Sequence, residues 1–349
     1  MAALDDTLLH PERAADAANL RYVSDDEDGY TRKRKGTGFA YYSASGEHIK
    51  DKKLKARFKA LVIPPMWDEV WICKHQNGHI QATGRDAKGR KQYIYHQKWR
   101  EVRDRAKFEH LIDFAEALPS LRSRLYRDMK KDGLPRDKVV AAVVKLLETT
   151  LIRVGNEAYA KRNKSYGLTT IRSKHVDVNG DDIEFEFKGK SGVEHDISLE
   201  NHALAEIVKA CDELPGYELF AYLDDDGKAR DVDSADVNAY LKEVTGSSFS
   251  AKDFRTWAAT TSSFSHLYKM DEAKDEKTIK QNITNAIKLV AEELGNTPAV
   301  CRSSYVHPFM LELYETGELR ERVAKVKKEP IRGLKKDEFL TLELIKQHP

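Results

Sequence analysis

The chain has 349 residues, of which 40% are hydrophobic and 33% are charged, with 59 lysines and arginines against 57 aspartates and glutamates. This length accommodates two domains that each bury a core, and the composition excludes a disordered or fibrous protein. The formal net charge of +2 does not by itself indicate a nucleic-acid binder. Basic residues are nevertheless concentrated at 31–36, 84–107 and 325–336, which fits either a phosphate-tracking surface or an ordinary solvated one.

The cysteines and the N-terminal segment indicate the cellular compartment in which the protein is expected. Cys73, Cys211 and Cys301 are far apart in sequence and form no CxxC pair, which favours a reducing cytoplasm. The first sixteen residues carry acids where a signal peptide needs basic residues, and no apolar run reaches membrane-spanning length. We therefore expect a cytoplasmic protein without a membrane partner.

The first part of the chain, residues 1–105, alternates short runs of β-forming residues with turn residues. QNG at 76–78 separates two such runs and predicts a β-hairpin. The basic segment 51–65 predicts a short helix that is stopped by its two closing prolines. The candidate strands are GFAYYS (38–43), VWIC (70–73), HIQAT (79–83) and KQYIYHQ (91–97).

Helical spacing of apolar residues begins near residue 97. The segment 99–118 predicts an amphipathic helix. Proline is favoured in the first turn of a helix, so Pro135 predicts the start of a second one that continues to about Arg162. This prediction places Arg153 near the end of a strongly apolar helix.

A small antiparallel sheet is predicted next. Ile183, Phe185 and Phe187 alternate with charged residues, the pattern of a strand with one buried face. The candidate strands are 170–178, 181–190 and 192–199, and the helices that follow are 201–214, 234–246, 251–269 and 278–295. The predicted fold class is α+β: a small strand-rich domain at 1–105, then a mostly helical domain with a small antiparallel sheet at 106–349.

Metal and nucleotide sites are not expected. His75 and His79 flank a hairpin turn with no third ligand nearby, whereas a metal site needs three or four. LDDDG at 223–227 lacks the acid spacing and closing glutamate of a calcium loop, and we interpret it as a turn. The sequence contains neither a Walker loop nor a dinucleotide fingerprint. We expect no cofactor.

Five polar residues deserve joint consideration: Arg153, Lys190, Arg255, Asn296 and Tyr305. Taken singly, an arginine in an apolar helix can extend its aliphatic chain so that the guanidinium reaches water. A lysine at a hairpin tip is ordinarily solvated. Together they supply two guanidiniums, one ammonium, one amide and one phenol, which are the groups needed to cleave a phosphodiester without a metal. Guanidiniums match non-bridging phosphate oxygens, a lysine can protonate a leaving alkoxide, and a phenol can attack reversibly.

The sequence segments around these residues resemble those of the small type IB DNA topoisomerases, the branch shared by poxviruses and bacteria. The resemblance covers residues 21–314. In the second half it is carried by IRVGNEAYAKRNKSYGLTTIRSKHV (152–176), FKGKSGVEHDI (187–197), KDFRTWAAT (252–260) and GNTPAVCRSSYVHP (295–308), and in the first half by PPMWDEVWI (64–72) and ATGRDAKGRKQYIYH (82–96).

This resemblance implies an ATP-independent isomerase that relaxes supercoiled DNA. A DNA-binding cap at 1–105 and a catalytic domain at 106–349 would form a C-shaped clamp around double-stranded DNA. Tyr305 would join a 3′ phosphate while the strand with the free 5′ hydroxyl rotates before religation. Arg153 and Arg255 would contact the phosphate, Lys190 would be the general acid, and Asn296 would donate to a non-bridging oxygen.

Further DNA contacts are implied at Gln92, Tyr93 and Tyr95 in the cap and at Tyr159 after the first arginine. The poxvirus pattern has histidine where this chain has Asn296, which can donate a hydrogen bond but cannot relay a proton. A monomer in the bacterial nucleoid is expected, with basic stretches lining the DNA face and acids on the far side. The C-terminal segment 325–349 is expected to be a basic, partly helical tail that adds phosphate contacts, or else a plainly solvated one.

Two other functions remain open from the sequence. A tyrosine recombinase uses the same cleavage chemistry but usually has histidine three residues before the second arginine, where this chain has Lys252. A DNA-binding protein that has lost catalysis would not need competent residues at all five catalytic positions, and this chain has them.

Overall fold

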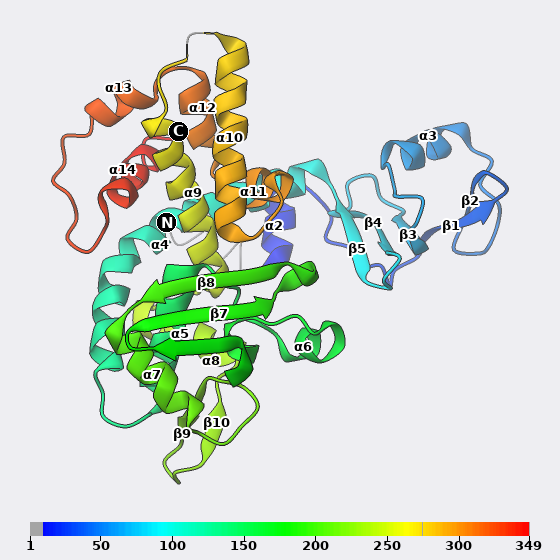
Figure 1. Cartoon of the computed structure of the whole chain (residues 1–349). Helices are drawn as coiled ribbons and strands as arrows, with labels where there is room; N and C mark the ends of the chain where they lie inside the picture. Colours follow the sequence, from blue (N-terminus) through cyan, green and yellow to red (C-terminus); the bar gives the residue numbers. More distant parts are fainter. Residues whose placement is uncertain (1–9, 274, 349) are drawn as a thin grey trace. The chain divides into compact units, whose positions relative to one another are not determined.

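The computed structural model describes residues 10–273 and 275–348 (Figure 1). The chain divides into two compact units, Met1–His110 and Leu111–Pro349, and the division falls within helix α4 (Gln97–Met129). In the described ranges no helix is both long and apolar enough to cross a membrane. The expectation that the N-terminus is no signal peptide concerns residues 1–16, of which 1–9 lie outside the described residues.

The first unit is built on one antiparallel sheet with the strand order β2-β1-β3-β4-β5. The hairpin predicted around QNG is confirmed, since β3 and β4 pair antiparallel on either side of it. The strands are β1 (Gly29–Lys35), β2 (Gly38–Tyr42), β3 (Asp68–Cys73), β4 (Ile80–Arg85) and β5 (Lys91–Tyr95), and the helices are α2 (Pro11–Ala17) and α3 (Lys52–Ala60).

Strand β1 was not predicted, because its TRKRK sequence has no alternation of apolar and polar residues. The structure explains the exception through Arg32, which is only 8% exposed. Its guanidinium donates to the carbonyls of Ile63 (2.9 Å), Pro64 (2.8 Å) and Trp67 (2.9 Å) and lies over the Phe39 ring. A buried cation is tolerated when its donors are satisfied. Arg32 is therefore a structural residue within a basic run.

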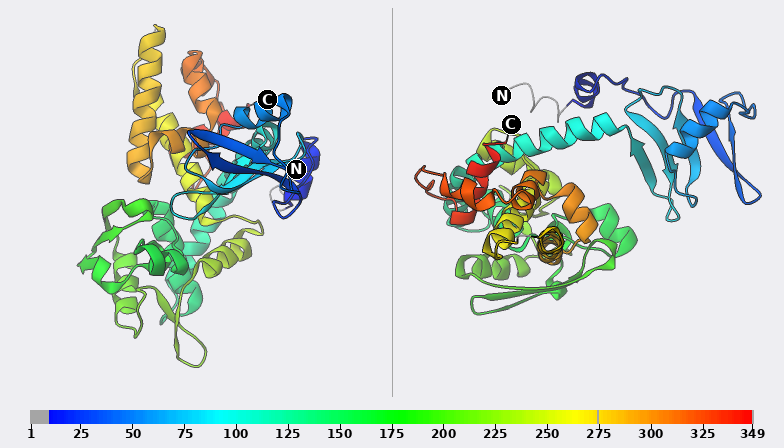
Figure 2. Two further views of the ribbon diagram at one scale, coloured as in Figure 1. Left: turned by 90° about the vertical axis from the view of Figure 1, so that its right-hand side faces the viewer. Right: turned by 90° about the horizontal axis from the view of Figure 1, so that it is seen from above.

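The second unit is mostly helical, with a three-stranded antiparallel sheet in the order β6-β7-β8. Helix α7 packs against β6 and β7, and α10 lies beside α12 (Figures 1 and 2). The elements are α5 (Arg136–Thr150), α6 (Glu157–Asn163), β6 (Val176–Asn179), β7 (Asp182–Lys188), β8 (Glu194–Glu200), α7 (His202–Asp212), β9 (Ala221–Leu223), β10 (Ala229–Asp231), α8 (Ser234–Thr245), α9 (Ala251–Lys269), α10 (Glu276–Leu294), α11 (Pro298–Ser304), α12 (Pro308–Glu315), α13 (Leu319–Ala324) and α14 (Lys336–Ile345).

The sheet bears out the alternation in the sequence: Ile183, Phe185 and Phe187 are buried, while the residues between them are exposed. The acidic turn predicted at 223–227 joins β9 to β10, where the Asp224 carboxylate accepts from the backbone N–H groups of Asp226 and Lys228. Strands β9 and β10 themselves were not predicted, because each has only three residues.

The single helix predicted from Pro135 to Arg162 is wrong. Helix α5 ends at Thr150, Leu151 adopts a left-handed φ of 56°, and α6 begins only at Glu157. Between them, the carbonyl oxygens of Arg153 and Val154 accept from the N–H groups of a later segment, at Leu168 (2.9 Å) and Thr169 (2.6 Å). This pairing replaces helical hydrogen bonds with tertiary ones. Arg153 therefore lies on a non-helical segment.

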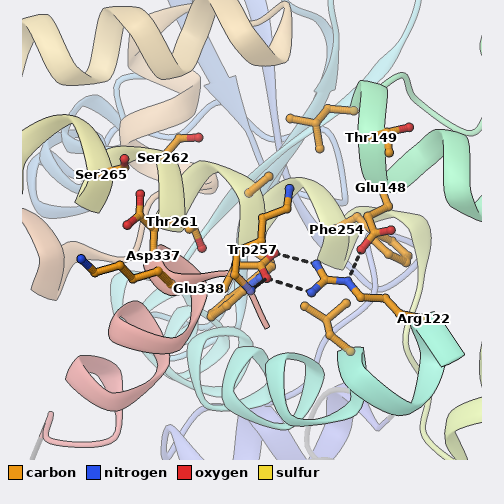
Figure 3. A pocket seen from close by; sticks show the side chains of 15 residues that line it. Arg122, Glu148, Thr149, Phe254, Trp257, Thr261, Ser262, Ser265, Asp337 and Glu338 are labelled. Atoms are coloured by element: carbon orange, nitrogen blue, oxygen red, sulfur yellow. Dashed lines mark hydrogen bonds and ion pairs between the residues drawn. The ribbon is translucent and has the colours of Figure 1, made fainter. Parts of the chain in front are cut away.

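The C-terminal helix α14 belongs to the core of the second unit. Its residues from Glu338 to Ile345 are buried, and it packs against α9. Figure 3 shows the guanidinium of Arg122 bonded to the carboxylates of Glu148 (2.5 Å) and Glu338 (2.6 and 2.8 Å). A plainly solvated tail is therefore wrong for residues 336–345.

Replacing Arg122 by alanine should lower the free energy of unfolding of the second unit by about 3–5 kcal/mol, since the buried carboxylate of Glu338 loses its guanidinium partner and Glu148 keeps only Lys145 among the described residues. Urea unfolding followed by far-UV circular dichroism measures this loss. Lys325→Ala is the matched control, because its ion pair with Glu321 is well exposed and should contribute little to stability. An equally small effect of both substitutions would show that the Arg122 cluster does not hold α14.

Candidate active site

A cavity of about 760 Å³ lies between the β7–β8 turn, the segment after α5 and the turn between α10 and α11. Four of the predicted catalytic residues line it: Arg153, Lys190, Asn296 and Tyr305. The fifth, Arg255, lies against Tyr305, with its guanidinium carbon 5.5 Å from the centre of the phenol ring. Residues spread over 150 positions of sequence are thus gathered at one place in the second unit.

Arg255 is anchored by the ends of two other helices. It lies in the second turn of α9 and is only 5% exposed. Its guanidinium donates to the carbonyl of Leu151, which follows α5, and to that of Leu294, the last residue of α10 (2.6 Å). Terminal helix carbonyls lack intrahelical partners and carry partial negative charge, which makes them suitable acceptors for a buried cation.

Arg153 and Asn296 form a direct pair. The guanidinium of Arg153 donates to the side-chain oxygen of Asn296 at 2.5 Å. Among the described residues the buried amide nitrogen of Asn296 has no hydrogen-bond partner. The amide therefore keeps an unsatisfied donor, while Arg153 fixes its orientation.

Tyr305 caps the C-terminus of the short helix α11. Its backbone N–H donates to the carbonyl of Cys301 (3.0 Å), and its own carbonyl accepts from the hydroxyl of Thr260 (3.2 Å). Burial tends to raise the pKa of the Tyr305 phenol, but the positive charges of Arg255, Arg153 and Lys252 outweigh burial and lower it. The phenol of Tyr305 is thus easier to ionise than that of a free tyrosine.

Lys190 is exposed on the turn between β7 and β8. The turn is closed by the Gly189 N–H, which donates to the carbonyl of Val193 (2.8 Å), and it is anchored by the buried aromatic side chains of β7. A lysine in this position can reach a ligand in the cavity without any burial of its own charge. The location at a hairpin tip agrees with the prediction.

None of the predicted DNA contacts is among the residues that line this cavity. In the first unit, the rings of Tyr93 and Tyr95 stack on one face of the edge strand β5, with centroids 5.7 Å apart. Gln92 lies on the opposite face and donates to Asp86 (3.0 Å). Tyr159 lies on α6 in the second unit and is 50% exposed.

Acidic residues are interleaved with the basic stretch 84–107, so the expectation that acids gather on a far side is wrong there. Lys91 pairs with Asp25 (2.7 Å), and Arg85 pairs with Glu69 (2.6 Å). Part of the local positive charge is thereby neutralised before any ligand binds.

Two residues that the structure places at the site were not identified from the sequence. Lys252 lies one turn before Arg255 on α9 and lowers the pKa of Tyr305. His195 lines the cavity from β8. The signal for Lys252 was its distance of three residues from Arg255, whereas a single histidine in an alternating strand gave no comparable signal for His195.

Comparison with known proteins identifies the family. The model for the catalytic core of eukaryotic DNA topoisomerase I matches residues 96–330, and the model for the N-terminal domain of bacterial DNA topoisomerase IB matches residues 38–86. The chain belongs to the type IB DNA topoisomerases. It is 37% identical over 298 residues to DNA topoisomerase 1B of Acanthamoeba polyphaga mimivirus, covering 83% of this chain and 88% of that protein. Over 248 residues it is 25% identical to DNA topoisomerase I of Monkeypox virus, covering 70% and 75% of the two chains.

Membership of this family decides between the functions left open by the sequence. The matched core spans all five predicted catalytic positions, and the matched N-terminal domain is of the bacterial type IB kind. A tyrosine recombinase does not account for that N-terminal match. The protein is a DNA topoisomerase, and DNA is its substrate.

Replacing Arg255 by alanine should raise the pKa of Tyr305, because Arg255 is foremost among the charges that lower it. At any pH below that pKa the variant then holds less phenolate than the unmodified protein. NMR titration of ¹³C-labelled tyrosine measures the change, with Tyr305→Phe assigning the signal. Arg302→Ala is the control, since Arg302 is exposed on α11 and is not among those charges. If the titration of Tyr305 were unchanged in Arg255→Ala, Arg255 would not be the charge that lowers the pKa of Tyr305.

Proposed function

We propose that this topoisomerase relaxes supercoiled DNA without ATP or a metal ion, by transient cleavage of one strand at Tyr305. The phenol attacks the scissile phosphorus, a 3′-phosphotyrosyl bond forms, and the bond to the 5′ oxygen breaks. The free strand rotates, and the 5′ hydroxyl then displaces the tyrosine. The covalent bond conserves the phosphodiester energy, so religation needs no ATP. The observation that carries the proposal is the gathering of Tyr305, Arg153 and Arg255 at one cavity, where the two guanidiniums lower the pKa of the phenol.

The two arginines stabilise charge on the phosphate. Attack on phosphorus concentrates negative charge on the non-bridging oxygens, and guanidiniums are suited to bind them with paired N–H donors. Arg255 is held by backbone carbonyls and Arg153 by Asn296, so both are oriented before DNA binds. Pre-organised donors cost no reorganisation during the reaction.

Asn296 and Lys190 have complementary roles. The unpartnered amide nitrogen of Asn296 donates to a non-bridging oxygen, which requires a donor and no proton transfer. Lys190 donates a proton to the departing 5′ oxygen, which otherwise leaves as an unstable alkoxide. Its exposed turn allows the ammonium group to approach the leaving group once DNA occupies the cavity.

The first unit is assigned the role of a DNA-binding cap, with residues 1–105 in the cap and 106–349 in the catalytic domain. Gln92, Tyr93 and Tyr95 contact DNA from the cap, and Tyr159 does so from the catalytic domain. The exposed ring of Tyr93 and the match to a bacterial type IB N-terminal domain support this assignment. The enzyme acts as a monomeric clamp on duplex DNA, in the nucleoid of a bacterial cytoplasm.

Replacing Tyr305 by phenylalanine should abolish relaxation and the covalent adduct while leaving DNA affinity nearly unchanged, since one hydroxyl is lost and no phosphate-binding charge. Relaxation of supercoiled plasmid in EDTA without ATP measures the activity, and denaturing gel electrophoresis measures the adduct. Tyr314→Phe is the matched control, because its hydroxyl bonds to Asn282 and Asp271 outside the cavity. A denaturation-resistant adduct in Tyr305→Phe would remove Tyr305 from the role of nucleophile.

Replacing Lys190 by alanine should slow cleavage about a hundredfold or more, the scale of lost general acid catalysis. In a substrate with sulfur at the 5′ bridging position, the leaving strand departs as a thiolate and needs no proton. This substrate should restore Lys190→Ala to nearly the rate of the unmodified enzyme, while Arg255→Ala stays slow because its charge acts on the non-bridging oxygens. Single-turnover cleavage of both substrates gives the comparison. Equal rescue of both variants, or of neither, contradicts the role of Lys190.

A further inference from the structure

His195 lines the cavity of the proposed catalytic residues, but no proposed catalytic step involves it. It is located on β8, just after the Lys190 turn, and lines the cavity together with Lys190 and Asn296. Its ring stacks on Phe187 of β7, with centroids 4.9 Å apart and an interplanar angle of 15°. Phe187 is buried, so the imidazole is supported on one face by the core of the sheet.

The tip of the imidazole fills a space that two glycines leave open. A β-carbon added to Gly189 would lie 2.5 Å from Nε2 of His195, and one added to Gly295 would lie 2.8 Å from its Cε1. Both distances are shorter than any real contact of a β-carbon. The ring therefore lies directly against the backbone of both residues.

These two glycines immediately precede catalytic residues. Gly189 comes just before Lys190, and Gly295 begins the turn that carries Asn296. The two backbone segments come from different parts of the chain, and the ring of His195 touches both. A rigid planar side chain in this position fixes the distance between them.

We propose that His195 is a positioning residue that holds the Lys190 turn at a fixed distance from the Gly295–Asn296 turn. This inference rests on the proposed catalytic roles of Lys190 and Asn296. Lys190 itself is exposed, and its turn contains a residue, Ser191, in the left-handed region at φ 66°. Such a turn needs support from neighbouring groups to keep one conformation. A displacement of about 1 Å of a catalytic group costs on the order of a hundredfold in rate.

The surroundings of His195 indicate that the planar shape of its ring matters for this role and that its charge does not. Burial lowers the pKa of the imidazole, and the nearby charges of Arg153 and Arg255 lower it further. The neutral form of the ring is therefore favoured, because a third cation would be repelled by the two guanidiniums. A phenylalanine at this position retains the planar ring and the stack on Phe187 but cannot exchange protons.

The test measures single-turnover cleavage and DNA affinity of His195→Ala and His195→Phe in the full-length protein. His195→Ala should cleave about tenfold or more slowly with unchanged affinity, and the 5′-sulfur substrate should recover most of this loss because the displaced group is the general acid. His195→Phe should retain most of the activity. His202→Ala is the matched control, since that histidine lies on the surface beyond the other end of β8 and bonds to Asp181.

Gly189→Ala gives a second test, and as a single substitution it leaves His195 in place. The added methyl group should displace the imidazole and slow cleavage in the presence of His195. The double variant Gly189→Ala, His195→Ala should be no slower than His195→Ala alone, because both changes disturb the same contact.

The outcomes separate this inference from the proposed function. Equal rates for the unmodified enzyme and His195→Ala overturn the positioning role, as does a His195→Phe variant as slow as His195→Ala. Additive losses in the double variant also overturn it. Absence of a covalent adduct from the unmodified enzyme would instead refute the assignment of Tyr305, whatever the His195 variants do.

Discussion

The proposed catalytic site depends on the attachment of Arg255 to backbone carbonyls. By bonding to the carbonyls of Leu151 and Leu294, this side chain ties the ends of α5 and α10 to α9. Arg153 follows the first of these carbonyls by two residues, and Asn296 follows the second by two. The same two hydrogen bonds that hold Arg255 therefore also position the segments that carry its partners, and Tyr305 lies over the guanidinium.

The contrast with Arg122 shows why this arrangement favours an anionic ligand. Arg122 is surrounded by the carboxylates of Glu148 and Glu338, which compensate its charge and make it a structural residue. In the part of the chain that the structure describes, no carboxylate pairs with Arg153 or Arg255. Two partly or fully desolvated cations close together raise the free energy of the empty site. A phosphate group relieves this repulsion, so the fold is prepared for the charge that develops during cleavage.

The sequence predicted features that depend on local pattern and missed those that depend on tertiary contacts. The alternation around Phe185 and the QNG turn specify their strands through neighbouring residues alone, and both predictions were confirmed. Arg32 could not be recognised as a buried residue, because its acceptors are carbonyls more than thirty residues away. The break after Thr150 was missed for the same reason, since apolar spacing favours a helix and only the distant Leu168 and Thr169 compete for its hydrogen bonds.

The asparagine at position 296 is consistent with this electrostatic design. Its side-chain oxygen accepts from Arg153, and its nitrogen has no hydrogen-bond partner among the described residues, which leaves both of its N–H donors for the proposed contact with a phosphate oxygen. A neutral histidine offers one acceptor and one donor, but its protonation removes the acceptor and places a second cation beside the guanidinium. The amide provides the same pair of contacts at every pH. Asn296 thus gives up proton transfer and retains an orientation that does not depend on its ionisation, which suits a position whose neighbour is already a partly buried arginine.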